Sequence, residues 1–388
     1  MMSTSLDIER AVNERYKRAA QTREEALCCP VSYNPKYLSV IPEEIKDRDY
    51  GCGDPSQFVR EGDTVLDLGS GGGKVCYIAA QIVGRDGLVV GVEANDQMLA
   101  LAKKYRRQIC DRIGYHNVEF RKGRIQDLAL DLTVVDSYLD ENPIRSADEL
   151  AGFENYCTRI REERPLISDE SIDVVLSNCV LNLVRPQDKE QLFAEMFRVV
   201  RSGGRIAISD IVSDEDVPER LQRDPELWSG CIAGAYREDA FLDAFDRAGF
   251  YGMEIVKRDE KPWRTIQGIE FRSITVVAHK GKQGPCWERK QAVIYRGPWS
   301  KVIDDDGHVL ERGKRAAVCD KTFQIYNRSP YAKDILPIEP HEVISLEEAE
   351  SFDCHRSALR NPRETKGLEY DVTDLSGAVC CEQGSDCC

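Results

Sequence analysis

The stretch Thr64-Val-Leu-Asp-Leu-Gly-Ser-Gly-Gly-Gly-Lys74 decides the fold that we expect for this chain. A short, mostly apolar segment runs into a cluster of glycines, and residues 74–83 then have the composition of a helix. A buried strand that passes through glycines into a helix is typical of the first unit of an α/β sheet.

The same alternation of strand and helix continues along the chain. We expect further strands at 88–92, 118–120, 171–177 and 205–209, with helices at about 95–113 and 189–200. Strands that alternate with helices at this spacing predict a doubly wound, Rossmann-like parallel sheet. Both faces of such a sheet are covered, which accounts for strands that are apolar throughout.

The regions around this sheet differ in composition. An amphipathic helix is expected over 5–26, the stretch 128–170 interrupts this alternation and is charged and helical, and short strands and turns follow from about 285. We therefore predict four regions: an N-terminal helical segment (1–62), a Rossmann-like domain (63–211) with a helical insertion (128–170), a sheet-completing region (212–283), and a small β-rich domain with a cysteine-rich tail (284–388).

Charge and composition exclude several classes of partner. The formal net charge of −15 disfavours binding to nucleic acid or to an anionic membrane surface, because both would repel the chain. No apolar run approaches the ~18 residues that span a bilayer, and the first residues do not resemble a signal peptide. We expect a cytoplasmic protein whose cysteines are mostly reduced thiols.

The glycine loop indicates a nucleoside ligand. A dinucleotide fingerprint would place glycine where Lys74 stands, so the pattern Asp67-x-Gly69-x-Gly71-x-Gly73 instead resembles the class I methyltransferases. This resemblance implies S-adenosylmethionine as cofactor, with Glu93 on the ribose hydroxyls and the segment 123–127 near the adenine. The residues expected to bind the cofactor are Asp67, Gly69, Ser70, Gly71, Gly73, Glu93, Ile125, Gln126 and Asn178.

Three cysteines stand in short segments that we expect to border the same pocket. Cys52 and Cys231 lie beside glycines, and Cys179 follows a strand at the carboxyl edge of the sheet, where open α/β sheets bind ligands. Thiolates select soft ions, and trivalent arsenic takes three sulfur ligands and keeps a lone pair that can attack a methyl group. These three cysteines are therefore the predicted ligands of As(III), whereas Cys76, Cys110 and Cys157 on helices are interpreted as structural.

The segments Tyr50-Gly-Cys-Gly53, Ser177–Val184 and Trp228–Ala235 closely resemble the arsenite methyltransferases. That resemblance implies methyl transfer from S-adenosylmethionine to arsenite, which would arrive as a thiol conjugate. It also implies a disulfide between Cys52 and an N-terminal cysteine after each transfer. Here two cysteines are available, Cys29, which we favour, and Cys28, and thioredoxin or glutathione would reset the pair.

Other functions stay open at this point. An ordinary methyltransferase acting on another small molecule would need a base such as Asp210. The insertion at 128–170 would suit a different alkyl or adenosyl transfer to arsenic. A non-enzymatic alternative is a thiol-rich metal-binding or redox protein that uses the tail pairs Cys380-Cys381 and Cys387-Cys388.

Overall fold

The structure is a computed structural model, and it describes residues 4–27, 31–354 and 358–372. The chain divides into two compact units, Met1–Gly281 and Lys282–Cys388. Within the described ranges, no helix combines the length and the apolar character needed to cross a membrane.

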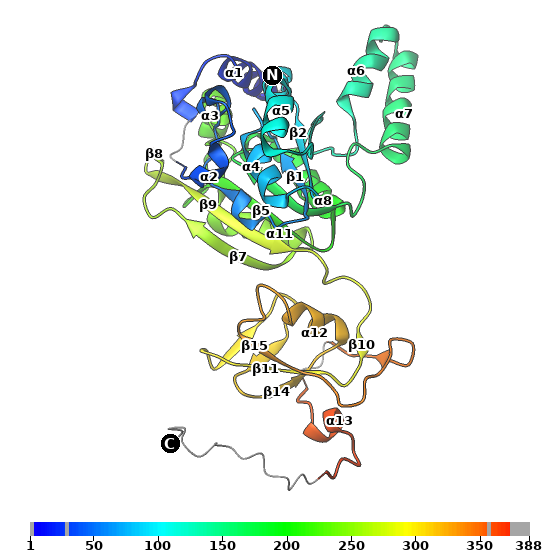
Figure 1. Cartoon of the computed structure of the whole chain (residues 1–388). Helices are drawn as coiled ribbons and strands as arrows, with labels where there is room; N and C mark the ends of the chain where they lie inside the picture. Colours follow the sequence, from blue (N-terminus) through cyan, green and yellow to red (C-terminus); the bar gives the residue numbers. More distant parts are fainter. Residues whose placement is uncertain (1–3, 28–30, 355–357, 373–388) are drawn as a thin grey trace. The chain divides into compact units, whose positions relative to one another are not determined.

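The first unit is built on one mixed sheet with the strand order β3-β2-β1-β4-β5-β9-β7 (Figure 1). Its first five members run parallel, whereas β9 lies antiparallel to both β5 and β7. Two short strands, β6 and β8, pair with β5 and β9. The strands are β1 (Thr64–Leu68), β2 (Leu88–Glu93), β3 (Val118–Lys122), β4 (Ile172–Asn178), β5 (Val200–Ser213), β6 (Tyr236–Arg237), β7 (Tyr251–Arg258), β8 (Arg264–Ile266) and β9 (Ile269–His279).

Helices cover both faces of this sheet. Val65 and Val174 point into a core with helices α4 and α5, while the next residues, Leu66 and Val175, point into a second core with α8 and α11. This alternation follows from the period of two along a strand. The helices of this unit are α1 (Thr4–Ala19), α2 (Pro35–Leu38), α3 (Glu43–Asp47), α4 (Lys74–Val83), α5 (Asp96–Ile113), α6 (Leu132–Glu141), α7 (Ala147–Glu163), α8 (Lys189–Val199), α9 (Glu219–Gln222), α10 (Pro225–Ser229) and α11 (Glu238–Arg247).

The predicted Rossmann-like sheet is confirmed, with differences at two elements. Helix α1 ends at Ala19 rather than near residue 26, because Tyr50 and Arg48 donate hydrogen bonds to its last carbonyls, at 2.9 Å to Ala19 and 2.7 Å to Ala20. Strand β5 is longer than the expected 205–209, because pairing with β9 extends it to Ser213.

The insertion between β3 and β4 forms a helical hairpin of α6 and α7 that projects from the sheet (Figure 1). Its two helices are held together by the stacked rings of Tyr138 and Tyr156, whose centroids are 3.9 Å apart. Asp131 and Ser146 cap the N-termini of the two helices.

The second unit is small and rich in short strands. A sheet of order β14-β11-β15 packs against helix α12, whose Phe323 is fully buried. Separate pairs join β10 to β16 and β12 to β13. The elements are β10 (Trp287–Glu288), β11 (Ala292–Tyr295), β12 (Lys301–Ile303), β13 (Val309–Glu311), β14 (Arg315–Ala317), α12 (Asp320–Tyr326), β15 (Ile335–Ile338), β16 (Glu350–Ser351) and α13 (Pro362–Lys366).

Candidate active site

A cavity of about 610 Å³ lies at the carboxyl edge of the parallel strands, beside the glycine loop. The loop turns from β1 into α4 with Gly69, Gly71 and Gly73 all at positive φ, a conformation that glycine adopts without strain. A Cβ on Gly71 would meet no atom within 4 Å, so the loop backbone is open to a ligand at this point.

Most of the residues expected to bind a cofactor line this cavity. They are Asp67, Gly69, Ser70, Gly71, Glu93, Ile125, Gln126 and Asn178. Gly73 is not part of the lining. It begins α4, and a Cβ at this position would come within 2.7 Å of the Phe120 ring, so this glycine allows α4 to pack closely against β3.

Two acids lie beside the loop: Asp67 is buried, and Glu93 is half-buried. The Glu93 carboxylate accepts hydrogen bonds from the backbone N–H groups of Gly71 (2.9 Å) and Asn95 (2.7 Å), and it thereby couples the end of β2 to the loop. Burial raises the pKa of Asp67 to about 7 and also raises the pKa of Glu93. Buried acids with raised pKa values favour a cationic ligand, because a positive charge would stabilise their ionised forms.

The segment after β3 forms another side of the cavity. Ile125 is nearly buried and Gln126 lines the cavity. The next residue, Asp127, accepts hydrogen bonds from Nε and Nη2 of Arg161 on α7, at 3.1 and 2.9 Å. The inserted hairpin therefore holds the loop that carries Gln126.

The three cysteines predicted as arsenic ligands lie in one apolar cluster at the same edge of the sheet. The thiol of Cys179 lies within hydrogen-bonding reach of both the Cys231 thiol and the Cys52 thiol. These contacts and burial raise the pKa of Cys179 well above its usual value. Cys179 also lines the cavity of the glycine loop, so this cavity extends to the thiol cluster.

Two of these cysteines have an unusual backbone. Cys179 has a φ of 64° and Cys231 a φ of 61°, in the left-handed region that residues with a side chain rarely adopt. A hydrogen bond from the Cys179 N–H to the Ser209 carbonyl (2.8 Å) holds the first turn, and the Cys231 thiol donates to the Cys179 carbonyl at 3.1 Å. Strain of this kind costs about 1–3 kcal/mol and clusters at functional sites.

Asn178 holds the Cys52 segment on the sheet. Its Oδ1 accepts from the N–H groups of Cys52 (2.8 Å) and Gly53 (3.0 Å), and its Nδ2 donates to the Gly53 carbonyl (2.7 Å). A Cβ on Gly51 would lie 2.1 Å from the Asn178 amide, so only glycine fits there. In the structure, Asn178 thus positions a thiol as well as lining the cavity.

Tyr16 is a site residue that the sequence analysis did not identify. It projects from α1, is half-buried, and places its hydroxyl 3.9 Å from the Cys231 sulfur. Its neighbour Arg15 donates to the Glu226 carbonyl (3.0 Å) and to Ser229 (3.1 Å), which ties α1 to the helix before Cys231. No local motif marks Tyr16, since its role arises only from the packing of α1.

Two expectations from the sequence remain, one about the N-terminal cysteines and one about Asp210. Cys28 and Cys29 lie outside the described residues. Asp210, the candidate base of an ordinary methyltransferase, lies within β5 and is completely buried. Its carboxylate accepts hydrogen bonds from the Leu181 N–H (2.9 Å) and the Asn182 amide (2.9 Å), and it is not part of the cavity lining.

This site defines a class I methyltransferase that uses S-adenosylmethionine, on the strength of the sheet, the glycine loop and the acid at the end of β2. A family described as a methyltransferase domain matches residues 60–162 and 145–249. An arsenite methyltransferase of Aquipseudomonas alcaligenes is 31% identical over 79% of this chain and 82% of its own length. The mouse arsenite methyltransferase is 30% identical over 79% of this chain and 74% of its own. The chain belongs to the arsenite methyltransferase family, as its motifs predicted.

A solved structure supports the same assignment. The arsenic(III) S-adenosylmethionine methyltransferase of Chlamydomonas reinhardtii is 27% identical, with a TM-score of 0.54 over 84% of this chain and all of that one. Residues 282–370 match a separate family, described as a domain of unknown function (DUF8838). The second unit therefore has a family assignment but no assigned role.

Proposed function

We propose that this chain methylates arsenite with S-adenosylmethionine, and that Cys52, Cys179 and Cys231 hold the arsenic during transfer. The observation that carries this proposal is Cys179, whose thiol interacts with two other thiols and which also lines the cavity of the glycine loop. The acceptor and the methyl donor would thus meet in adjoining spaces.

The cavity suits S-adenosylmethionine. Among the described residues, the buried Ser70 hydroxyl has no hydrogen-bonding partner. The acids Asp67 and Glu93 offer negative charge to a cationic ligand. When bound, the cofactor supplies a methyl group on a sulfonium, which is already activated for transfer. The residues of the chain then have to bind and orient the two reactants and exclude water. Good alignment of the reactants alone can supply about 7–11 kcal/mol of the activation barrier.

The thiols bind arsenite by exchange. Each thiol displaces one oxygen or sulfur ligand of the arsenic and passes its proton to that leaving group, so no net charge enters the apolar cluster. This suits Cys52 and Cys179, whose raised pKa values keep them protonated before arsenic binds. The hydrogen bond from the Cys231 thiol to the Cys179 carbonyl (3.1 Å) keeps these two segments adjacent.

Transfer of a methyl cation to the arsenic lone pair raises arsenic to the pentavalent state. The thiol of Cys29 or Cys28 would then attack the sulfur of arsenic-bound Cys52 and lose its one proton. A disulfide forms, the As–S bond to Cys52 breaks, and its electron pair returns to arsenic as a lone pair, which restores the trivalent state. Thioredoxin or glutathione would reduce that disulfide by thiol exchange, as a reducing cytoplasm allows. We therefore propose a thiol reductant as partner and the cytoplasm as location.

The test replaces Cys179 or Cys231 by serine and measures methylated arsenicals by mass spectrometry. Cys110→Ser, a buried cysteine on α5, is the matched control. We expect at least a 100-fold loss of methylation in the first two variants, unchanged binding of S-adenosylmethionine, and normal activity in the control. Methylation that persists in Cys179→Ser would refute the ligand role.

A further inference from the structure

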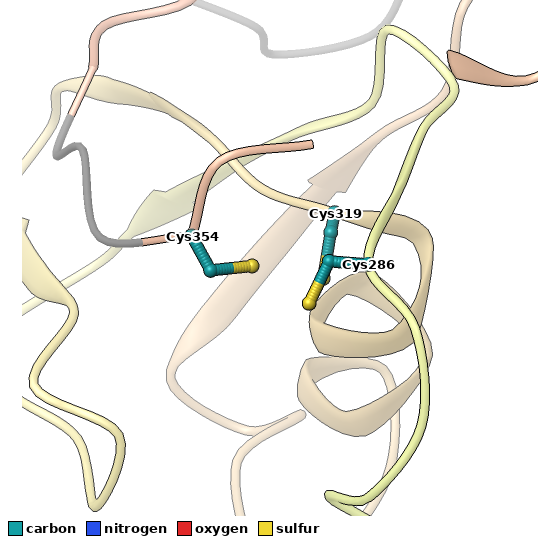
Figure 2. A group of neighbouring side chains, drawn as sticks. All are labelled: Cys286, Cys319 and Cys354. Atoms are coloured by element: carbon teal, nitrogen blue, oxygen red, sulfur yellow. The ribbon is translucent and has the colours of Figure 1, made fainter. Parts of the chain in front are cut away.

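The second unit brings together three cysteines that are distant in the sequence. The sulfur atoms of Cys286, Cys319 and Cys354 all lie within 4.8 Å of one another. Figure 2 shows the Cys354 side chain directed toward the other two, with Cys319 at the start of α12. This is a different set of thiols from the three beside the glycine loop.

Strand pairing brings the first and last of these cysteines together. Strands β10 and β16 run antiparallel, with Trp287 opposite Ser351. Just beyond this pair, the N–H of Phe352 donates to the carbonyl of Cys286 at 2.8 Å. Because Cys286 precedes β10 and Cys354 follows β16, the ladder places both at the same end.

The third cysteine is fixed by helix α12. Cys319 is fully buried, and its sulfur accepts from the Thr322 N–H at 3.4 Å and lies 3.2 Å from the Thr322 hydroxyl. A salt bridge of 2.7 Å between Arg289 and Asp320 joins the helix to the segment after β10. The cluster is therefore held by the backbone of the fold and is not an accident of flexible side chains.

The surroundings are suited to a ligand that enters from solvent. Cys286 and Cys354 are partly exposed, while Cys319 closes the base of the site. Burial disfavours ionisation of Cys286, but hydrogen bonds from Cys354 and Cys319 and the nearby Lys321 ammonium outweigh it and lower the pKa of this thiol. Lys321 is held in place by its bond to the Gly284 carbonyl at 3.0 Å.

We propose that Cys286, Cys319 and Cys354 form a second binding site for trivalent arsenic, outside the catalytic centre. Arsenite would bind as As(OH)₃: each thiol forms one As–S bond, one As–O bond breaks, and one water leaves. Three waters are released and nothing is oxidised or reduced. The site does not depend on the catalytic role proposed for Cys179, because no residue is shared.

The number of ligands favours arsenic over zinc. Structural zinc sites almost always have four ligands, whereas trivalent arsenic is complete with three sulfurs, whose charges balance it. Among the residues that the structure describes, no fourth cysteine, histidine or acid joins this group. His355 follows Cys354 in the sequence but lies outside the described residues, so the experiment includes zinc as an outcome.

The test counts arsenic atoms bound to the full-length, reduced chain without S-adenosylmethionine. The chain is dialysed against low micromolar arsenite, and arsenic and zinc per chain are measured by elemental mass spectrometry. We expect Cys286→Ser to bind about one arsenic fewer than the wild type, and Cys110→Ser to bind the wild-type amount. Cys286 is partly exposed, so its replacement leaves the core intact, and circular dichroism checks this.

A second measurement isolates the new site. In the double variant Cys179→Ser/Cys231→Ser, X-ray absorption of bound arsenic should show three sulfur neighbours, and adding Cys286→Ser should remove them. An unchanged arsenic count in Cys286→Ser overturns the proposal, as does one tightly bound zinc per chain that needs Cys286 and that arsenite does not displace. Loss of catalysis in Cys179→Ser bears only on the first site.

Discussion

At the scale of the residue, we expect Asp67, the buried acid beside the glycine loop, to determine how cofactor binding responds to pH. The pKa of Asp67 is raised to about 7 by burial, above its ordinary value of 3.8. The ligand-free chain therefore favours the protonated acid, and it loses that stabilisation as pH rises from about 4 to about 7. A cationic ligand has the opposite preference, so binding should strengthen as the acid ionises.

We accordingly expect the dissociation constant of S-adenosylmethionine to fall about tenfold between pH 6 and pH 8. In Asp67→Asn the dissociation constant should depend less steeply on pH. At pH 8 the ligand-free variant should also melt at a higher temperature than the wild type. Isothermal titration calorimetry and thermal unfolding at each pH give both quantities. Equal slopes in the two proteins would exclude Asp67 as the titrating group.

Tyr16 provides a second test at this scale. Its hydroxyl lies 3.9 Å from the Cys231 sulfur, and a hydrogen bond of this type contributes about 1 kcal/mol. Tyr16→Phe keeps the ring and its edge-to-face contact with Tyr50, so α1 should remain folded. We expect about fivefold weaker binding of arsenite, measured by dialysis, with no change in Tyr115→Phe. Unaltered affinity in Tyr16→Phe would leave this hydroxyl a packing role alone.

At the scale of the element, the inserted hairpin supports the loop that holds Gln126. A salt bridge between Arg161 on α7 and Asp127 joins the hairpin to this loop, and the arginine side chain is 39% exposed. Solvent screening limits such a pair to about 0.5–1 kcal/mol. The hairpin is thus expected to tune the cofactor site without building it.

Arg161→Gln should therefore weaken binding of S-adenosylmethionine two- to fivefold, while arsenite binding stays the same. The matched control is Arg164→Gln, an exposed arginine at the end of the same helix. Calorimetry with each ligand separates the two effects. If arsenite binding weakened instead, the hairpin would belong to the acceptor site.

Most elements around the sheet follow from local pattern, and the exceptions have physical causes. Residues 64–68 and 74–83 form a strand and a helix as predicted, because their apolar periodicity agrees with their packing. The end of α1 and the length of β5 could not be predicted, since Tyr50, Arg48 and β9 determine them from elsewhere in the chain. Local propensity is a weak guide where tertiary partners satisfy the backbone.

At the scale of the whole molecule, the two units have separate cores. All the residues of the candidate active site lie before Gly281, in the first unit. A chain that ends at residue 281 should therefore fold, bind S-adenosylmethionine within about threefold of the full-length affinity, and lose about one bound arsenic. Calorimetry and arsenic counting measure both. An unfolded fragment would show that the first unit needs the second.

The sequence by itself determined the Rossmann-like fold and its glycine loop, and it singled out three cysteines that the structure places in one cluster, because short runs of residues carry each of these signals. Only the tertiary structure decided that Tyr16 lies beside Cys231, that Asn178 holds the Cys52 segment, and that Cys286, Cys319 and Cys354 form a cluster. Strand order and helix packing set these distances between remote segments. No local pattern encodes such a distance, since it depends on every element that lies between.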